Sequence, residues 1–503
     1  MPNKIASLEE LAKLLEKYRR RSQVIVQCHG VFDLLHIGHI RYLQAARQLG
    51  DVLVVTVTAD EFVNKGPHRP VFEERLRAQA LAALDCVDHV SIHDCPTATE
   101  ALRRLRPDVY VKGAEYRDDK TPELLAEEAE AAALGIRVEF IEEIRSSSSF
   151  LINNYLSPFT DKADQYLLKF RRGHTAKDVL GGLAQARDLR VLVVGEAILD
   201  EYVTCSTLGQ ATKSPNVVGR FLAQERYLGG ALAVANHLAG FCREVRLISL
   251  LGREQTEEEW IRAQLRPAVQ ARFLYKPGAP TIVKRQYREV YYANTLFELN
   301  YLDETPLADS EVELLDQWLR GEAAGADVVV VADYGHTMLG PPSIRAICER
   351  ARYLVASTPA NAANLGYHTI SQYPRADYLC LAEHDLRLDR RSRSGDVAQL
   401  LVQVAQGLQA RLSAVTVGSK GCLCYGPEAG FAQAPALATR VVDRFGAAES
   451  FLAVTSLCAA LRVPLEILAF LGNVAGAEAV AVMGNSQFLE EAAFRRHVES
   501  LLK

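Results

Sequence analysis

Two histidines that enclose an Ile-Gly pair are the residues of this chain best suited to chemistry. His36 and His39 stand in CHGVFDLLHIGHIRYLQAAR, residues 28–47. The apolar run at 24–26 predicts a buried strand, and we expect a helix to begin near His39. Free N–H groups and the positive end of the helix dipole attract phosphate at such a helix start, and Gly38 lets it approach. The pattern predicts a phosphate site whose imidazoles face charge that develops during a reaction.

A metal site is the other chemistry that such a histidine pair offers. Zinc is disfavoured, because no glutamate lies between the two histidines and no third ligand stands at a typical spacing. Asp33 has two interpretations that stay open. It orients a histidine or the metal-bound phosphates, or it only caps a turn.

Basic and hydroxyl side chains come after three further expected strands. Lys65-Gly66 and Arg69-Pro70 form a basic loop, which clamps phosphate or is merely solvated. Lys112-Gly113 ends a strand, at the edge where open α/β sheets bind ligands. Arg145 precedes the serines at 146–149, which form either a second phosphate cradle or a low-complexity linker.

Composition and charge narrow the class of protein. The chain has 503 residues, 49% hydrophobic and 24% charged, which predicts a globular protein with two or more domains. A net charge of −5 argues against a nucleic-acid partner. No apolar run reaches the about 18 residues of a membrane span, and we see no signal peptide. Ten cysteines without a CxxC pair predict reduced thiols and a cytoplasmic protein, with Cys422 and Cys424 on one face of a strand.

Strands and helices alternate along the chain, which predicts α/β domains with parallel sheets. In the first part the expected strands are Val24–Gln27, Val52–Val57, His89–Ile92, Val109–Lys112 and Arg137–Ile141, and the expected helices are Ile40–Leu49, Phe72–Ala83, Thr97–Leu105 and Thr121–Leu134. In the second part we expect strands at Val191–Gly195, Arg246–Leu251, Asp327–Ala332, Tyr353–Ser357 and Ala414–Val417, and a long helix from Phe445. We divide the chain into a domain at 1–150, a connector at 151–188 and a domain at 189–503.

Residues 24–153 resemble the HxGH cytidylyltransferase-like family. The similar stretches are VFDLLHIGHIRYLQAARQLGD, NKGPHRPVFEERL, PDVYVKGAEYRD and IRSSSSF. Within that family they look most like the nucleotidyltransferase half of the bifunctional heptose kinase/adenylyltransferases. The resemblance implies a Rossmann-like fold that joins a nucleoside monophosphate from ATP or CTP to a sugar phosphate, of the heptose-1-phosphate type, for glycan precursor synthesis. Pyrophosphate leaves, and Mg²⁺ bridges the nucleotide phosphates without a protein cage.

The resemblance also implies roles for individual residues. His36, His39 and Lys65 are the expected catalytic residues. Nucleotide or phosphate binding is expected of Gly30, Phe32, Asp33, Gly38, Arg69, Lys112, Gly113, Arg145, Ser146, Ser147 and Ser148.

Residues from about 190 to 500 resemble the ribokinase-like (PfkB) sugar kinases, again of the heptose kinase type. The similar stretches are VLVVGEAILDEY, VVVADYGHTML, AVTVGSKGCLCYG and VVDRFGAAESF. The site residues that this implies are Asp200, Gly229, Gly230, Asp333, Gly418, Gly421, Asp443, Gly446 and Glu449. The order of the two domains is the reverse of that in the familiar heptose enzymes. Homo-oligomerisation is expected only by analogy with this fold.

The second resemblance departs from its family at four functional places. The family motif Asp-Thr-x-Gly-Ala-Gly-Asp reads DRFGAAE at 443–449, so Glu449 replaces the aspartate that takes the proton of the sugar hydroxyl. The extra methylene moves the carboxylate by more than about 1 Å. Ala448 replaces a glycine, which matters if that position needs a positive φ. Ala233 replaces a sugar-contacting asparagine of the family. The family's metal-linked Asn-x-x-Glu segment falls at 382–385, where its asparagine is lost.

Three interpretations of the second domain stay open. The first, which we favour here, is a pseudokinase that binds a ligand and acts as a scaffold. The second is an active but atypical sugar kinase with Glu449 as its base, which makes the chain fully bifunctional. The third is a structural module for dimerisation. Separately, the whole chain could be a ligand-sensing regulator made of two decayed enzyme domains, but the intact HIGH sequence argues against this.

Overall fold

The computed structural model describes residues 4–63, 70–114, 122–141, 159–291 and 294–503 of the chain. By contacts between Cα atoms the chain divides into two compact units, residues 1–158 and 159–498, with the last few residues shared between them. We describe each unit by itself and call them unit 1 and unit 2.

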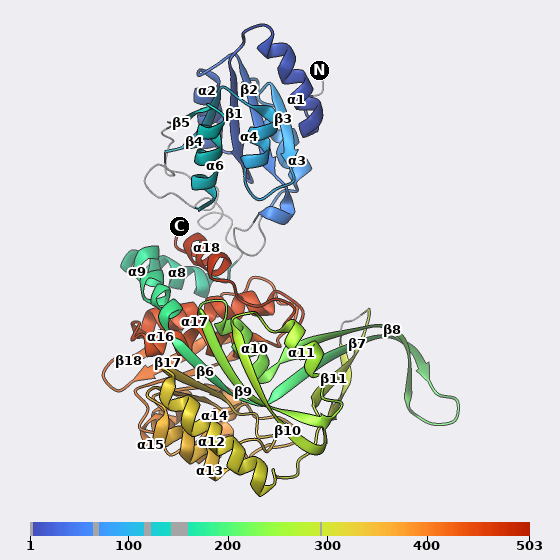
Figure 1. Ribbon diagram of the computed structural model, residues 1–503, viewed down its shortest axis with the longest axis vertical. Helices are drawn as coiled ribbons and strands as arrows, with labels where there is room; N and C mark the ends of the chain where they lie inside the picture. Colours follow the sequence, from blue (N-terminus) through green and yellow to red (C-terminus); the bar gives the residue numbers. More distant parts are fainter. Residues whose placement is uncertain (1–3, 64–69, 115–121, 142–158, 292–293) are drawn as a thin grey trace. The chain divides into compact units, whose positions relative to one another are not determined.

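Unit 1 is a parallel sheet covered by helices on both faces (Figure 1). The sheet order is β3-β2-β1-β4-β5, formed by β1 Ile25–Gly30, β2 Val52–Thr58, β3 His89–His93, β4 Val109–Gly113 and β5 Arg137–Ile141. The helices are α1 Leu8–Arg19, α2 Ile37–Arg47, α3 Glu74–Ala82, α4 Thr99–Leu105 and α6 Pro122–Ala133, and a 3₁₀ turn spans Asp60–Phe62. The strand order reverses between β1 and β4, which is where open α/β sheets bind ligands.

Buried apolar runs produce these strands, as the sequence predicts. Every residue of β2 is buried, because helices cover the sheet on both sides. Side chains of α2 and α3 pack on one face, and those of α1, α4 and α6 pack on the other. The expected helix near His39 begins earlier, at Ile37, because the side chain of His36 caps it.

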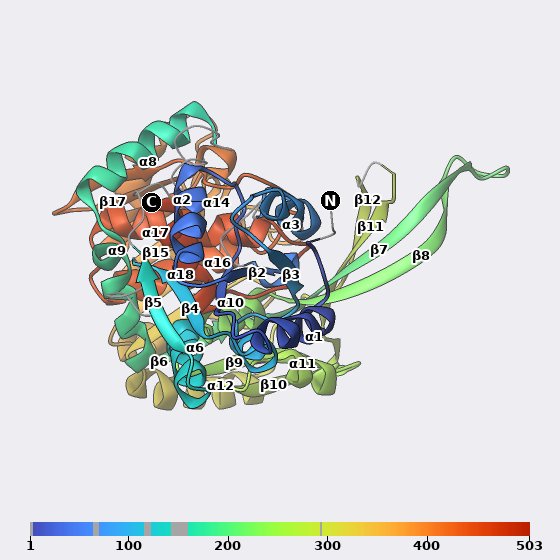
Figure 2. The same ribbon diagram turned by 90° about the horizontal axis from the view of Figure 1, so that it is seen from above.

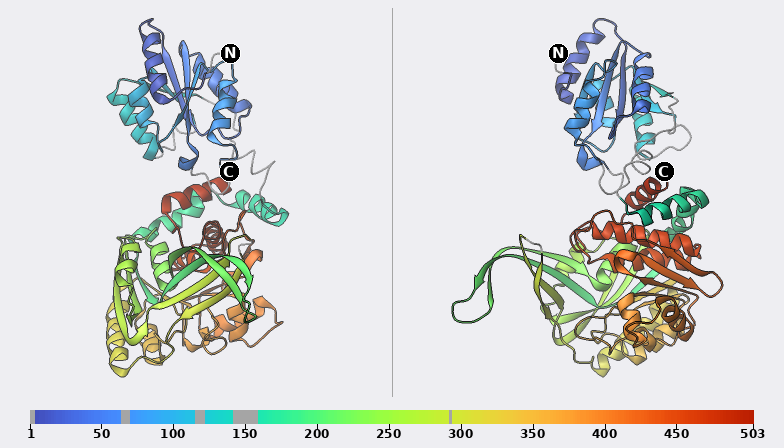
Figure 3. Two further views of the ribbon diagram at one scale, coloured as in Figure 1. Left: turned by 90° about the vertical axis from the view of Figure 1, so that its right-hand side faces the viewer. Right: turned by 180° about the vertical axis from the view of Figure 1, so that it is seen from behind.

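Unit 2 is built on a larger sheet between two layers of helices (Figure 3). Its strand order is β10-β9-β6-β13-β14-β15-β16-β17-β18, from β6 Arg190–Gly195, β9 Glu244–Glu254, β10 Val269–Pro280, β13 Val328–Ala332, β14 Leu354–Ser357, β15 Tyr378–Ala382, β16 Leu412–Thr416, β17 Cys422–Gly426 and β18 Gly430–Ala434. The five strands that the sequence predicts for this part correspond to β6, β9, β13, β14 and β16. The pairs that include β17 and β18 are antiparallel.

Helices cover both faces of this sheet. Side chains of α12 Asp309–Gly325, α13 Pro341–Arg350, α14 Glu383–Asp389 and α15 Val397–Gly407 pack in one buried apolar cluster with it. On the other side α10 Gly230–Leu238, α16 Ala447–Ala460 and α17 Leu465–Val480 contact its strands. The remaining helices of the unit are α8 Asp161–Gly173, α9 Ala176–Leu183, α11 Glu258–Gln264 and α18 Glu491–Leu501.

A second, smaller sheet of unit 2 was not predicted from the sequence. Its order is β12-β11-β7-β8, from β7 Ala197–Gln210, β8 Val217–Gly229, β11 Ile282–Glu289 and β12 Thr295–Tyr301. β7 and β8 continue beyond the rest of this sheet as a long two-stranded ribbon (Figure 2). We call this sheet the side sheet.

The segment expected to be a connector contains helices that pack on unit 2. Phe170 of α8 stacks on Phe470 of α17, with 4.5 Å between the ring centroids. Cys422 and Cys424 do lie on one face of β17, with their sulfur atoms 3.9 Å apart. Over the described ranges, no helix is long and apolar enough to cross a membrane.

Candidate active sites

In unit 1, His36 closes the first turn of α2. Its Nδ1 accepts a hydrogen bond from the backbone N–H of Gly38 at 3.1 Å. A neutral ring that accepts at Nδ1 carries its proton on Nε2, which leaves Nε2–H as a donor. Burial lowers the pKa of His36, which favours that neutral form. The ring of His39 lies beside it, with centroids 4.0 Å apart.

The loop between β1 and α2 is tied to the segment before α3. Asp33 is 4% exposed, and its Oδ1 accepts from the N–H groups of Val71 at 2.7 Å and Phe72 at 3.1 Å. This is capping across a long stretch of sequence rather than within one turn. Phe32 has a positive φ of 49° and stacks edge-on with His39. A side chain at Gly30 would crowd Phe32.

Arg77 was not predicted from the sequence. It connects the loop after β1 to β2 and to the segment before α3. Its buried guanidinium donates to the carbonyl groups of Val31, Thr58 and Phe72 and pairs with Asp60. These contacts join the loop after β1, the end of β2 and the start of α3. The local sequence pattern does not mark Arg77, because its partners Val31 and Thr58 lie 46 and 19 residues away along the chain.

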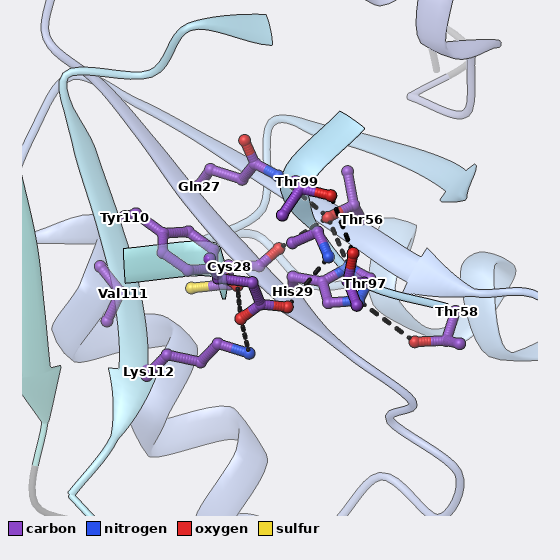
Figure 4. Close-up of polar contacts among 12 residues, drawn as sticks. Gln27, Cys28, His29, Thr56, Thr58, Thr97, Thr99, Tyr110, Val111 and Lys112 are labelled. Atoms are coloured by element: carbon purple, nitrogen blue, oxygen red, sulfur yellow. Dashed lines mark hydrogen bonds and ion pairs between the residues drawn. The ribbon is translucent and has the colours of Figure 1, made fainter. Parts of the chain in front are cut away.

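Lys112 is engaged inside unit 1. Its Nζ pairs with Glu127 of α6 at 2.7 Å, and Glu127 also accepts from the hydroxyl of Tyr110 at 2.9 Å. Figure 4 shows these contacts beside His29, which lies 3.0 Å from Thr56 Oγ1. Burial, with Lys112 nearby, lowers the pKa of His29 well below its ordinary value. Gly113 ends β4 next to this polar layer. A phosphate role for Lys112 stays a prediction.

Several predicted site residues of the first part lie outside the described residues. They are Lys65, Arg69, Arg145, Ser146, Ser147 and Ser148. Their roles stay predictions from the sequence.

In unit 2, the segment DRFGAAE runs into the start of α16, which spans Ala447–Ala460. Gly446 precedes the helix with a φ of +84°, and a Cβ there would overlap Asn485. Ala448 lies within α16 and does not have a positive φ, so its replacement of glycine brings no backbone strain. Asp443 accepts from the N–H groups of Arg444 at 2.7 Å and Gly484 at 3.1 Å.

The side sheet brings Asp200 to the same place. A Cβ at Gly229 would overlap the Asp200 carboxylate, and Gly230 has a φ of +58° that favours glycine. Burial is the main cause that raises the pKa of Asp200 to about 7, Lys284 opposes it, and Glu449 adds to it. Lys284 also lies 5.7 Å from the centroid of the Tyr334 ring, whose hydroxyl donates to Glu449 at 3.0 Å. Sequence analysis did not identify Lys284, which pairs with Asp200 in register on β11.

The carboxylate of Asp333 is fully buried and binds neighbouring protein groups. Its carboxylate accepts from the Tyr373 hydroxyl at 2.7 Å and from the N–H of Gly335 at 3.1 Å, and it pairs with His368 at 3.0 Å. The next residue, Tyr334, donates its hydroxyl to Glu449 at 3.0 Å. The structure thus brings Tyr334 to the site, whereas Asp333 holds the loop.

The other positions singled out in the kinase-like part lie in helices or at a turn. Gly418 and Gly421 flank a 3₁₀ turn after β16 with φ values of +57° and +95°. Ala233 is fully buried in α10. Asp385 caps α14 by accepting from the N–H of Ala382 at 3.1 Å, and it also accepts from the N–H of Ala360.

No group of three or more His, Cys, Asp or Glu side chains among the described residues is arranged to hold a metal ion. A Mg²⁺ ion fits these sites only if phosphate oxygens supply most of its ligands.

Comparison with protein families accounts for both units. A cytidylyltransferase-like model matches residues 27–154, and the model of the pfkB family carbohydrate kinases matches residues 188–492, more than half of the chain. The chain belongs to the pfkB family. The pfkB unit is similar in fold to phosphofructokinase-2 from Escherichia coli in complex with potassium, with a TM-score of 0.51 at 15% identity. That match covers 63% of this chain and all of that one. The expected fold class is confirmed for both units.

The unit that precedes the pfkB unit is similar to part of the bifunctional HldE proteins. The protein from Syntrophotalea carbinolica is 41% identical over 165 residues, which is 32% of each chain. The one from Geobacter metallireducens is 41% identical over 148 residues, 29% of each chain. These matches fall in the nucleotidyltransferase region. The chain thus spans about a third of the length of these curated relatives.

Proposed function

We propose that the chain is a bifunctional enzyme, with a nucleotidyltransferase in unit 1 and a sugar kinase in the pfkB unit. The observation that carries the first half is the cap of α2, where a neutral His36 keeps a donor at Nε2 next to His39. The 41% identity to proteins named bifunctional HldE supports the same activity. The proposed acceptor is a sugar phosphate of the heptose-1-phosphate type, and the donor is ATP or CTP.

The first reaction needs little more than positioning and neutralised charge. An oxygen of the sugar phosphate attacks the α-phosphorus of the nucleoside triphosphate. The bond from that phosphorus to the α–β bridging oxygen breaks, and pyrophosphate leaves with the electron pair. Nε2–H of His36 and the ring of His39 stabilise the charge on the α-phosphate, and the start of α2 adds its dipole.

The second reaction uses the start of α16. Glu449 takes the proton of a sugar hydroxyl, and the hydroxyl oxygen attacks the γ-phosphorus of ATP. The bond to the β–γ bridging oxygen breaks, and ADP leaves. Asp200 binds a neighbouring sugar hydroxyl, and the first N–H groups of α16 receive the negative charge that builds up. The pairing of Lys284 with Asp200 in register, and the positions of Lys284 over the ring and Glu449 at the hydroxyl of Tyr334, support this assignment.

Mg²⁺ would enter both sites with the nucleotide. When bound, it neutralises phosphate charge and polarises the reacting phosphorus. We keep the division at 150 and 188, the cytoplasmic location, homo-oligomerisation and the roles of Lys65, Arg69, Arg145 and the serines at 146–148 as proposals.

A pseudokinase remains the second candidate for the pfkB unit. Ala233 and Ala382 are the specific observations that favour it, since neither carries the amide that sugar or metal binding would use. The family match itself does not favour it, and a carboxylate is still present at the start of α16.

One experiment separates these possibilities. The full-length protein is incubated with ATP or CTP and a panel of sugar phosphates, and pyrophosphate and ADP are measured separately. Release of both products supports the bifunctional enzyme. Release of pyrophosphate alone, with ATP still stabilising the pfkB unit against heat, would identify a pseudokinase. No pyrophosphate with any combination would refute the transferase.

A further inference from the structure

Glu449 is the carboxylate on which the proposed kinase step depends, so any role for a neighbour of Glu449 rests on that proposed function. Its side chain has one more methylene than aspartate, and so one more rotatable bond. Displacement of a catalytic group by about 1 Å can cost a factor of about 100 in rate. A glutamate at this position therefore needs a partner that fixes its carboxylate.

Such a partner comes from the loop after β13. The hydroxyl of Tyr334 donates to Oε1 of Glu449 at 3.0 Å, across 115 residues of sequence. Tyr334 is 7% exposed, so water competes little for this bond. A hydrogen bond to a charged acceptor in such surroundings is among the stronger ones in proteins.

Tyr334 cannot easily move away, because its backbone is bound on both sides. The N–H groups of Tyr334 and His336 donate to the two carboxylate oxygens of Glu196, each at 2.9 Å. The carbonyl of Tyr334 accepts from the side-chain amides of Asn361, at 2.7 Å, and Asn364. Glu196 is fully buried at the end of β6. The loop is thus anchored to the main sheet.

The same loop holds a strained residue. Thr337 has a φ of +72°, which a β-branched side chain rarely adopts, at a cost of about 1–3 kcal/mol. Its hydroxyl donates to the carbonyl of Thr305 at 3.0 Å and accepts from Lys276 at 3.1 Å. Such a conformation persists only where the surroundings leave the chain no alternative. The part of the loop that follows Tyr334 in the chain is therefore fixed as well.

The charges around the pair keep Tyr334 a donor. Asp200 of β7 and Glu196, which follows β6, disfavour the phenolate form of Tyr334, whereas Lys284 of β11 lies over its ring, 5.7 Å from the centroid. Burial is the largest of the causes that raise the pKa of Tyr334 well above its ordinary value, and Glu449 adds to it. The phenol thus stays protonated at neutral pH, and its proton lies between it and Glu449.

We propose that Tyr334 is a positioning residue that holds the Glu449 carboxylate in place at the start of α16. It touches neither the sugar nor the nucleotide. It supplies this placement from a loop that is itself anchored to the main sheet.

The test is a double-substitution cycle in the full-length protein, with ADP release measured for the sugar phosphate that the unaltered protein uses. Tyr334→Phe removes the hydroxyl, and Glu449→Asp withdraws the carboxylate from it. We expect each to lower kcat about 10- to 100-fold, with the KM for ATP changed less than about twofold. The double variant should be about as slow as the slower single variant, because both remove one interaction.

Tyr378→Phe is the matched control. Tyr378 is a fully buried tyrosine of β15, on a different strand from the loop that carries Tyr334. Glu449→Asp should lower kcat for ADP release by the same factor in Tyr378→Phe as in the unaltered protein. If Tyr334→Phe keeps kcat within about twofold, or if its effect multiplies with that of Glu449→Asp, the positioning role is wrong while the kinase stands. If the unaltered protein makes no ADP, the proposed kinase fails, and the positioning role fails with it.

Discussion

At the scale of the residue, the protonation of His29 affects the stability of unit 1. It is 9% exposed, lies 3.0 Å from Thr56 Oγ1, and has a pKa well below 6.5 because of burial. Below pH 6.5 the unfolded chain therefore binds more protons at this residue than the folded protein does. The stability that results is complete above pH 6.5 and is lost as the pH falls.

His29→Gln should therefore reduce the acid sensitivity of unit 1. We expect its free energy of unfolding to fall less steeply below about pH 6.5 than that of the unaltered protein, by up to about 1.4 kcal/mol per pH unit. Hydrogen exchange of the β1 amides at several pH values measures this locally. His384→Gln, outside unit 1 and exposed, is the control and should keep the original slope. Equal slopes for all three proteins would contradict the assignment.

At the scale of elements, Arg77 joins three pieces of unit 1 that carry its site. Arg77→Met leaves the carbonyl groups of Val31, Thr58 and Phe72 without their charged donor. We expect a loss of about 3 kcal/mol in the stability of unit 1, measured by denaturant unfolding. Arg75→Met, two residues away and more exposed, should cost less than about 0.5 kcal/mol. Similar losses in both variants would show that Arg77 holds nothing together.

The start of α16 offers a sharper test of geometry. At Gly446→Ala a methyl group would meet a φ of +84° and overlap Asn485. We expect ADP release to be lost and pyrophosphate release to be retained. Gly430→Ala has a similar φ of +73° but open space around it, so it should cost about 1 kcal/mol and leave ADP release intact. Retained ADP release in Gly446→Ala would mean that the kinase step does not use this helix start.

Elements differ in how well the sequence predicts them. The strands of unit 1 were predictable, because a parallel sheet covered on both faces appears as runs such as VLVVTVT in β2. The side sheet was not. In β8 the residues from Val217 to Glu225 are exposed, so their order of polar and apolar residues does not indicate a core face.

The site was predictable where its chemistry is local. His36, Gly38 and His39 are neighbours in sequence and lie together at one helix start. Tyr334 was missed, because its meaning depends on a contact with Glu449 that only the fold creates. The concern over Ala448 also came from the motif alone, and it disappears because that residue lies inside α16.

At the scale of the whole molecule, the chain combines a unit similar to part of the bifunctional HldE proteins with a pfkB unit. If each unit carries out its own reaction, damage to one site should leave the other product unchanged. This independence distinguishes a bifunctional enzyme from a transferase with an inert partner domain.

The most direct measurement is the release of both products by three full-length proteins: the unaltered chain, His39→Ala and Glu449→Gln. We predict that His39→Ala loses pyrophosphate release by about 100-fold or more and keeps ADP release, and that Glu449→Gln does the reverse. An unaltered chain that releases pyrophosphate but no ADP, or a Glu449→Gln variant that releases ADP at the original rate, would contradict the account.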